Sequence, residues 1–320
     1  MIVGVSPAIR RALVLAERYA RTPLPVLLVG ATGTGKEVFA EHIHQRSGRP
    51  GPLVDVNCGA LPHEMVESLL FGHRRGAFTG AVESTEGYVA RAHGGTLFLD
   101  ELTSLEPDAQ VKLLRVLETG EVEPLGAGRK RDIDLRIVAA AQDDLSGALS
   151  EGRVRRDLYQ RLAGVVIDLP RLEHRPEDLV PLAQHFASLD RHSLAPGVDA
   201  VIHGYAWPGN VRELRLAIQR AGYLVEDGTL SAAAVAQAIA LGQEAASDQR
   251  RSLEDIITAG VATGWNAARM AEGLRIHRAT LFRRLGHHGL TLRSLRESHE
   301  SHESRDSRTT GATVGAGVAP

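Results

Sequence analysis

The feature that most constrains the fold is a glycine-rich turn between a short apolar segment and a helical pattern. The apolar segment is 26–29 (VLLV), and the turn is GATGTGK at residues 30–36. Glycines there let backbone N–H groups surround phosphate oxygens, the following helix N-terminus adds a favourable dipole, and the lysine reaches the outer phosphates. A nucleotide-binding loop is expected, and a plain glycine-rich turn is the alternative. The expected nucleotide-binding residues here are Gly30, Ala31, Thr32, Gly33, Thr34, Gly35, Lys36 and Glu37.

An acidic strand end supplies the second half of such a site. Residues 96–101 (TLFLDE) form an apolar run that ends in Asp100 and Glu101. Asp100 is expected to bind Mg²⁺, directly or through water, and Glu101 to orient and polarise the water that attacks ATP. Glu37 stands where the general motif has a Ser or Thr ligand for magnesium, so this second segment matters. Together the segments predict an ATPase that uses ATP and Mg²⁺.

Strands and helices alternate through the first part of the chain. The apolar runs lie at 26–29, 53–56, 96–99, 135–140 and 165–169. Runs of this length suit strands that are buried on both faces of a parallel sheet. Between them, residues 109–118 show helical spacing of Val111, Leu114 and Leu117. This alternation predicts a three-layer α/β domain.

The later part of the chain has a different pattern. Strand signals stop after Pro170, and helical patterns follow, with a break at Trp207-Pro208-Gly209. A small polar stretch suggests a linker, and the C-terminal residues lack periodicity, which predicts disorder. The expected divisions are an α/β domain at 1–170, a helical domain at 171–241, a linker at 242–250, a second helical block at 251–295 and a disordered tail at 296–320.

Composition excludes several classes of protein. The chain is 43% apolar and 24% charged, as is ordinary for a globular protein, and its net charge of -2 gives no overall sign of nucleic-acid binding. One cysteine, Cys58, rules out an intramolecular disulfide and fits a reducing compartment. No apolar run approaches the ~18 residues of a membrane span, and Met1–Ser6 is too short for a signal peptide. We expect a cytoplasmic protein without a membrane partner.

Further motifs resemble those of a known family. They are LFGH at 70–73 followed by GAFTGA at 76–81, GGTLFLDE at 94–101 and WPGNVREL at 207–214. With the phosphate loop, they resemble the AAA+ activators of sigma-54 RNA polymerase, also called bacterial enhancer-binding proteins, over residues 4 to about 290. That family also carries Glu at the position of Glu37. The resemblance implies an AAA+ domain with a parallel sheet and a helical lid. It also implies a bacterial protein associated with the nucleoid.

The hexapeptide GAFTGA is the family's signature surface loop. Gly76 and Gly80 permit sharp turns on either side of Phe78 and Thr79, and a buried hairpin tip is one interpretation. The resemblance implies instead that the loop rises from a ring of subunits when ATP is bound and contacts the sigma factor. An exposed aromatic side chain on a mobile loop suits such a contact. The expected contact residues are Gly76, Ala77, Phe78, Thr79, Gly80 and Ala81.

Other roles are implied by position within the family's motifs. Arg155 and Arg161 match two arginine fingers, which reach a neighbouring subunit's nucleotide and offset transition-state charge. Two exposed helix arginines are the alternative. Arg212 matches a lid residue that touches nucleotide phosphate. Asn57 matches a polar switch that holds the catalytic Glu101 until nucleotide and target are in place.

The sequence departs from the family at several positions. Ala31 and Leu69 each replace a usual Glu, and Ala141 and Gln142 replace a Thr-Asn sensor. Gln142 offers the same amide one methylene further out. We expect an active ATPase in which hydrolysis, or its coupling to loop movement, is altered at this sensor.

The C-terminal block has a strong local charge. Residues 251–296 contain eight arginines and three acidic residues, a balance of +5 that suggests phosphate contact. The stretch 274–285 (LRIHRATLFRRL) resembles a Fis-type helix-turn-helix, although an ordinary basic helical hairpin is the alternative. Its second helix would enter the major groove. The expected base contacts are His277, Arg278 and Thr280, and the expected phosphate contacts are Arg283 and Arg284.

These features predict a DNA-binding activator that converts closed sigma-54 polymerase complexes to open ones. It would bind upstream enhancer DNA as dimers, assemble into a ring, expected to be a hexamer, and hydrolyse ATP between subunits. The start of the motor within the first few residues suggests that no N-terminal sensory domain precedes it. Control would then come from a regulatory protein acting in trans, from expression level or from no signal at all. The alternatives are a hydrolysis-impaired DNA-binding repressor and a AAA+ remodeller of another assembly.

Overall fold

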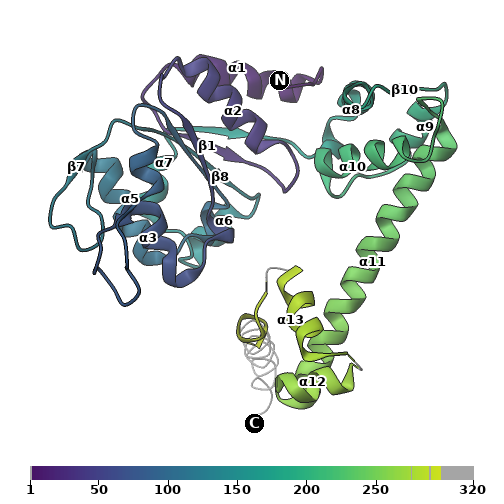
Figure 1. Cartoon of the computed structure of the whole chain (residues 1–320). Coiled ribbons are helices and arrows are strands. Elements are labelled where there is room, and N and C mark those ends of the chain that lie inside the picture. The colour runs from purple at the N-terminus through teal and green to yellow at the C-terminus, as the bar shows by residue number, and fades with distance from the viewer. Residues whose placement is uncertain (1, 275, 288–289, 297–320) are drawn as a thin grey trace, which may run out of the picture. The chain divides into compact units, whose positions relative to one another are not determined.

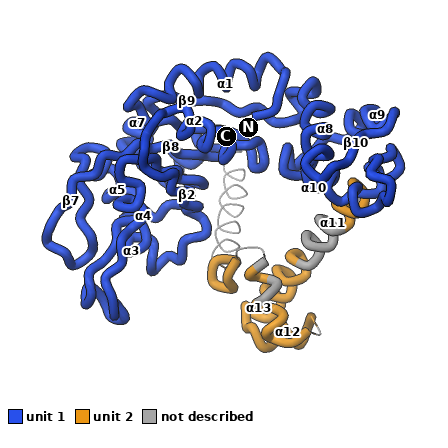
Figure 2. The backbone as a smooth tube through the Cα atoms, turned by 45° about the horizontal axis from the view of Figure 1, so that its top comes forward, with its two compact units in different colours: residues 1–238 blue, residues 239–320 orange. Residues whose placement is uncertain are grey.

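The computed structural model describes residues 2–274, 276–287 and 290–296 (Figure 1). Side chains are described within this range except at 245–252, 283, 284 and 287. The chain forms two compact units, residues 1–238 and residues 239–320 (Figure 2). The tail expected at 296–320 lies outside the described residues, apart from Arg296.

A parallel five-stranded sheet forms the centre of the first unit. Its strand order is β2-β5-β8-β1-β9, and every pairing is parallel. All five predicted strands are confirmed to within one residue at either end. They are β1 (Val26–Val29), β2 (Leu53–Asn57), β5 (Thr96–Asp100), β8 (Arg136–Ala141) and β9 (Val165–Asp168).

Helices cover both faces of this sheet, which confirms the three-layer prediction (Figure 1). Alternate residues of each strand explain this arrangement, since Leu97 and Leu99 of β5 join one apolar core and Phe98 joins the other. On the Phe98 side lie α1 (Pro7–Ala20) and α2 (Lys36–Ser47). On the other side lie α3 (Val66–Phe71), α5 (Pro107–Thr119), which was predicted at 109–118, and α7 (Arg156–Leu162).

Two short hairpins extend from the α/β domain. The first hairpin, residues 72–86, pairs β3 (Gly72–His73) with β4 (Thr85–Glu86), and the second, residues 121–132, pairs β6 (Glu121–Val122) with β7 (Arg131–Asp132). The remaining short elements of this domain are 3₁₀ helices η1 (Cys58–Ala60), η2 (His63–Met65) and η3 (Leu102–Ser104), and helices α4 (Tyr88–Arg91) and α6 (Leu145–Ser150).

A small helical lid follows the sheet. Its elements are η4 (Leu172–His174), η5 (Pro176–Asp178), α8 (Leu179–Leu189), β10 (Ser193–Leu194), α9 (Val198–His203), α10 (Asn210–Gly222) and β11 (Thr229–Leu230). The expectation that strands end with the sheet is wrong in one detail, because β10 and β11 form a parallel pair. Two residues are too few to give a sequence signal. The predicted break at Trp207 lies between α9 and α10, where this residue is 2% exposed and donates from Nε1 to the Ile202 carbonyl at 2.8 Å.

A buried polar network ties the N-terminal segment to the start of the lid. Asp178 is 0% exposed, and its carboxylate accepts hydrogen bonds from Val5 N (2.5 Å), Ser6 N (2.7 Å) and Ser6 Oγ (2.8 Å). Arg175 lies 3.8 Å from the same carboxylate and donates to the Thr34 carbonyl of the phosphate loop at 3.0 Å. Burial lowers the pKa of Arg175, and the charge of Asp178 opposes that shift. The network therefore joins three segments that are distant in sequence.

The second unit is helical. The helix α11 (Ala232–Thr263) begins in the last residues of the first unit and runs through the segment 242–250, so the linker expected there is a helix and not a loop. The Ala, Gln and Glu residues of this segment are good helix formers, which explains the error. Next come α12 (Ala267–Gly273) and α13 (Arg278–His287), and α13 begins within the stretch 274–285 that resembles a helix-turn-helix. Within the described residues, no helix combines the length and apolar character that a membrane crossing requires.

Candidate functional site

The phosphate loop follows β1 at the carboxyl edge of the sheet. Gly30 N donates to the Ala141 carbonyl at 3.2 Å, which fixes the start of the loop against the end of β8. Gly33 and Gly35 have φ values of 78° and 107°, a left-handed backbone that glycine adopts without strain. The helix α2 then starts at Lys36, so its N-terminal N–H groups face the loop as the sequence predicts.

Lys36 is held inside the loop. Its side chain is 9% exposed, and Nζ donates to the carbonyls of Gly30 (2.7 Å) and Ala31 (3.1 Å). Burial lowers the pKa of Lys36, and the carboxylates of Asp100 and Asp143 oppose the shift. An ammonium group with few water contacts and nearby acids is suited to binding phosphate oxygens.

The lid rests directly on the phosphate loop. The Gly33 carbonyl accepts from Val211 N (2.9 Å) and Arg212 N (3.3 Å) at the start of α10. Asn210 donates from Nδ2 to the Thr32 carbonyl at 3.0 Å. A side chain at position 33 would come within 2.3 Å of the Gly209 carbonyl, so this contact requires glycine. The position of α10 is thus coupled to the loop backbone.

A cavity of about 280 Å³ opens beside the loop. It collects most of the expected site, namely Thr32, Gly33, Gly35, Lys36, Glu37, Asn57, Asp100, Glu101, Ala141, Gln142 and Arg212. Sequence reasoning missed four more lining residues, which are Val38, Phe186, Val211 and Arg215. Arg215 follows Arg212 by three residues on α10, so helical spacing could have identified it. Phe186 comes from α8 and has no comparable local signal.

The two carboxylates stand at the end of β5. Asn57 of β2 pairs in register with Asp100, which places both at the same edge of the sheet. Glu101 has a left-handed backbone with φ 53°, and its N–H donates to Asp100 Oδ1 at 2.9 Å. Non-glycine residues in this conformation are uncommon and cluster at functional sites. The Asn57 side chain accepts from Ala60 N at 3.1 Å, and none of the hydrogen bonds among the described residues joins it to Glu101.

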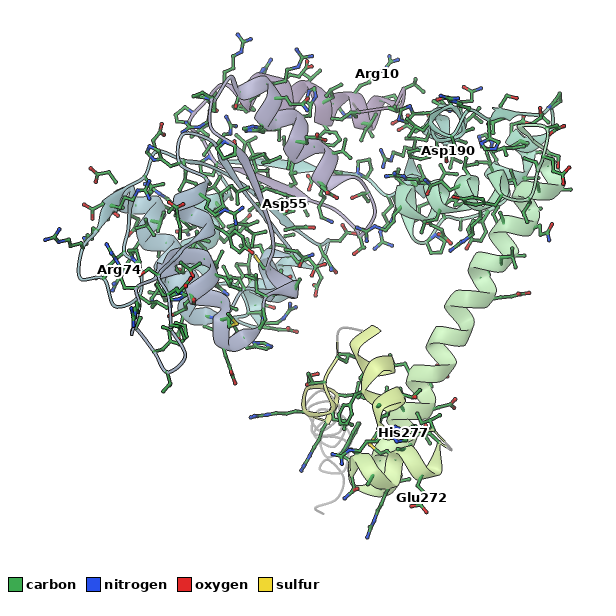
Figure 3. The ribbon with its side chains drawn as sticks, viewed as in Figure 1. Arg10, Asp55, Arg74, Asp190, Glu272 and His277 are labelled. Carbon is green, nitrogen blue, oxygen red and sulfur yellow. The ribbon has the colours of Figure 1, made fainter. Side chains whose placement is uncertain are left out.

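Burial, together with the nearby carboxylates, raises the pKa values of two groups beside the site. Cys58, directly after Asn57, is 3% exposed, and burial foremost, then Asp100 and Glu101, raises the pKa of its thiol to about 12. Burial also raises the pKa of Asp55, which Figure 3 labels on β2, with Glu37 and Asp100 adding to the effect. A concentration of negative charge beside Lys36 is where a divalent cation is expected.

A second, more apolar cavity of about 210 Å³ adjoins the first. It shares Gly35, Val38, Phe186, Val211 and Arg215 with that cavity. Its other walls include Ile2, Val3, Phe39 and Leu182. Aliphatic and aromatic walls beside a phosphate loop suit a flat nucleotide base.

The two proposed arginine fingers lie outside both cavities. Arg155 precedes α7 and makes a two-pronged contact with Asp157, from Nε at 3.1 Å and from Nη2 at 2.7 Å. This contact raises the pKa of Arg155 and lowers that of Asp157. Arg161 donates to the Leu117 carbonyl at 3.3 Å. Both side chains are therefore exposed and held by contacts close to α7.

The hexapeptide forms the tip of the first hairpin. Gly76 N donates to the Ala81 carbonyl at 2.9 Å, which closes the tip into a tight loop. Phe78 is 42% exposed, and its ring lies 5.0 Å from that of His73. The tip is therefore an exposed loop, and Ala81 is the residue within it that is buried.

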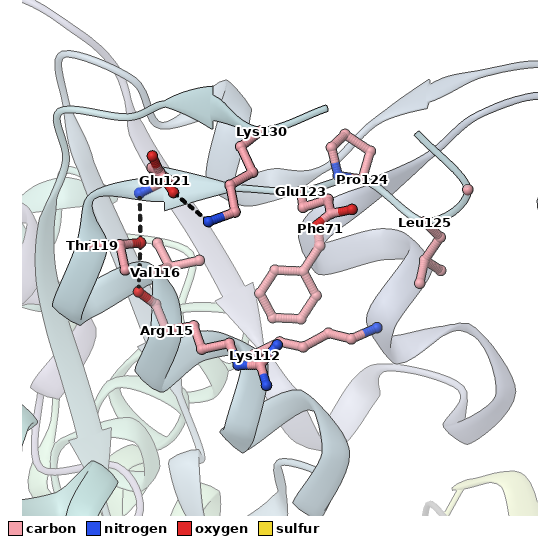
Figure 4. A pocket seen from close by; sticks show the side chains of 11 residues that line it. Phe71, Lys112, Arg115, Val116, Thr119, Glu121, Glu123, Pro124, Leu125 and Lys130 are labelled. Atoms are coloured by element: carbon pink, nitrogen blue, oxygen red, sulfur yellow. Dashed lines mark hydrogen bonds and ion pairs between the residues drawn. The ribbon is translucent and has the colours of Figure 1, made fainter. Parts of the chain in front are cut away.

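The second hairpin is hydrogen-bonded to the first. Arg74 N donates to the Leu125 carbonyl at 3.0 Å, and Leu125 N donates to the Gly72 carbonyl at 2.9 Å. An added side chain at Gly126 would lie 2.9 Å from Ala77, so the backbones are in close contact. Beside these contacts is a cavity of about 540 Å³ (Figure 4). It is lined by Phe71 and by charged residues of α5 and the second hairpin, including Lys112, Arg115, Glu121 and Lys130.

The expected DNA-binding residues lie on or beside α13. His277 (labelled in Figure 3) caps this helix, since its Nδ1 accepts from Ala279 N at 3.3 Å. His277 and Arg278 are exposed, and Thr280 is half-buried. The side chains of Arg283 and Arg284 lie outside the described part of the structure.

Comparisons with known proteins match this architecture. Residues 2–168 match the sigma-54 interaction domain, and residues 173–252 match an AAA+ ATPase lid domain. The chain is 46% identical over 240 residues to the Nif-specific regulatory protein of Azorhizobium caulinodans, covering 72% of this chain and 38% of that relative. It is 41% identical over 303 residues to the transcriptional regulatory protein ZraR of Klebsiella oxytoca, covering 89% of this chain and 68% of the relative.

Among solved structures, NtrX from Brucella abortus in complex with ATP aligns with a TM-score of 0.66 and 31% identity, covering 89% of this chain and 68% of that one. The chain thus spans 38% to 68% of the length of the relatives described. The sigma-54 interaction match alone covers more than half of the 320 residues. By this match, and by its parallel sheet with an AAA+ lid, this chain belongs to the family of proteins with a sigma-54 interaction domain.

Proposed function

We propose that this chain is an ATP-hydrolysing, DNA-binding transcriptional activator that remodels closed complexes of sigma-54 RNA polymerase into open ones. The observation that carries the proposal is the presence, in one unit, of a cavity beside a phosphate loop and an exposed hexapeptide loop. The regulatory names of the relatives and the ATP complex of NtrX support it.

ATP and Mg²⁺ suit the residues that line the cavity. The left-handed backbone of Gly33 and Gly35 suits a loop whose N–H groups surround phosphate oxygens, and the buried Lys36 would bind the outer phosphates. Mg²⁺, held by Asp100 directly or through water, would offset charge on the phosphates. Glu101 would orient and polarise the attacking water, and Arg212 would contact phosphate from the lid.

The chain path supports coupling between nucleotide and hexapeptide. From Asn57, the segment through η1, η2 and α3 leads directly into β3 of the first hairpin. From Glu101, η3 and α5 lead into β6 of the second hairpin. Both hairpins therefore connect to the residues proposed to sense hydrolysis, with Gln142 of the altered sensor lining the same cavity.

The surface position of the two expected arginine fingers supports the proposal that hydrolysis takes place between subunits. Arg155 and Arg161 are on the surface and outside this chain's own cavity, as residues that act in a neighbouring subunit must be. We propose a ring, expected to be a hexamer, built from dimers bound to enhancer DNA. The pair α12–α13 is the proposed helix-turn-helix. Control by a regulatory protein in trans is part of the same proposal.

The test is open-complex formation on a sigma-54 promoter together with ATP turnover. Thr79→Ala should retain ATP turnover and lose open-complex formation. Val82→Ala, 74% exposed and just beyond the hexapeptide, is the matched control and should retain both. Equal open-complex formation by the two variants would remove the hexapeptide from the mechanism. Wild-type chain without turnover at ring-forming concentration would favour the repressor alternative.

A further inference from the structure

The exposed face of α13 includes one large apolar side chain, Phe282, that is not among the DNA contacts expected from the sequence. Leu281 and Leu285 of this helix are 0% and 1% exposed in a core shared with α11 and α12. Phe282 is 45% exposed. A single exposed aromatic residue is common on protein surfaces, so its significance depends on its neighbours.

The neighbour of Phe282 is Arg278, one helical turn earlier. The Arg278 Cζ lies 5.7 Å from the centroid of the Phe282 ring, a cation–π contact between residues i and i+4. Stacking uses the flat face of the guanidinium and leaves its N–H donors at the edge available. It also restricts the rotamers of a long side chain. The ring and the guanidinium therefore present one preorganised surface at the N-terminal end of α13.

We propose that Phe282 is a specificity-determining residue that contacts the 5-methyl group of a thymine, beside a guanine bound by Arg278. The inference rests on the DNA binding proposed above. Arginine binds the O6 and N7 of guanine in the major groove, and apolar side chains such as Phe contact the thymine methyl. Four residues of helix advance about 6 Å, against about 3.4 Å for each base step. The thymine therefore lies within about two base pairs of the guanine.

Charge favours DNA over a protein surface as the occupant of this face. The block 251–296 has a balance of +5, and Arg283 and Arg284 directly follow Phe282 in sequence. Protein–protein interfaces are depleted of Lys, Glu and Asp but enriched in Phe and Arg, so the Arg278–Phe282 pair alone suits either occupant. The positive balance of the whole block favours DNA, because protein–DNA interfaces are strongly positive. The N-terminal residues of a recognition helix are also those that reach base edges.

The experiment removes the methyl group from the DNA. Duplexes that bind the full chain are selected from a random pool, and each thymine of the resulting site is replaced in turn by deoxyuridine. At one position the replacement should weaken binding by the wild-type chain about fourfold. This factor corresponds to the free energy of about 0.8 kcal/mol gained by burying one methyl group. That position should lie within two base pairs of a guanine. Phe282→Ala should bind the thymine and deoxyuridine duplexes equally.

Val261→Ala, an exposed apolar change on α11 at 49% exposure, is the matched control and should keep the wild-type ratio. The inference is overturned if no deoxyuridine position affects the wild-type chain, or if Phe282→Ala keeps the wild-type ratio. A change in oligomeric state of Phe282→Ala with an unchanged ratio would assign the ring to a contact between copies. If no duplex is selected, the proposed DNA binding fails as well, so the two failures are distinguishable.

Discussion

Removing the Asp178 carboxylate should destabilise the first unit strongly. In Asp178→Ala, the N–H groups of Val5 and Ser6 and the Ser6 hydroxyl lose their acceptor. Arg175, 2% exposed, would keep its charge without the carboxylate 3.8 Å away. Breaking a buried pair by removing one partner costs about 3–5 kcal/mol. With an m-value of about 3 kcal/mol/M, near the upper end for small proteins, the urea midpoint should fall by about 1–2 M.

The assay is urea unfolding followed by the fluorescence of Trp207, in a Trp265→Phe background so that only the lid reports. Glu177→Ala is the matched control, because this carboxylate is the exposed neighbour of Asp178 in η5. Surface changes of that kind cost within about 0.5 kcal/mol. Equal midpoints for the two variants would refute the idea that the buried network holds the lid and the N-terminal segment together.

Three other predictions follow from the site and its surroundings. Gly33→Ala should weaken ATP binding at least about tenfold, because the added methyl group would push the lid off the phosphate loop. Gly48→Ala is the control and should bind ATP as the wild type does, since Gly48 has a similar positive φ of 71° but open space around it. Titration with a fluorescent nucleotide compares the two variants. Burial foremost, then Arg49, lowers the pKa of His44 below 6.5. Below about pH 6.5 the unfolded state therefore binds more protons than the folded state, so the free energy of unfolding should fall on acidification. The fall should be smaller in His44→Gln. Urea midpoints of both proteins at about pH 7.5 and 5.5 measure the difference. Cys58, with its pKa of about 12, should resist a thiol reagent at about pH 8 until urea is added; rapid native labelling would contradict its burial.

The sequence predicted the sheet and its carboxyl edge because both have local signals. Continuous apolar runs identify strands buried on both faces, and polar residues directly after them, such as Asn57 and Asp100, must meet at one edge of a parallel sheet. The spacing of apolar residues that predicted α5 is a local signal of the same kind. The sensor residues Ala141 and Gln142, which were expected to affect hydrolysis or its coupling, both line the cavity.

Features that depend on contacts between distant segments were not predicted. The hydrogen bonds from α10 to the phosphate loop, the role of Asn210 in them and the buried Arg175–Asp178 pair join residues whose separation hides any periodic pattern. Phe186 reaches the cavity only because α8 packs against α10. The helical course of 242–250 was missed for another reason, since small polar residues suggested a loop although several favour helix.

The bonds that join Leu125 to the first hairpin also allow the hexapeptide to be observed at a distance. A reporter fixed to the second hairpin would move with the first, without altering any residue of the hexapeptide. Arg129 is exposed on that hairpin and could be replaced by cysteine to receive a dye. Because the one natural cysteine is buried, such a dye would label a single place on each chain. The motion of the hexapeptide during each round of nucleotide exchange could then be followed as a change in the fluorescence of the dye.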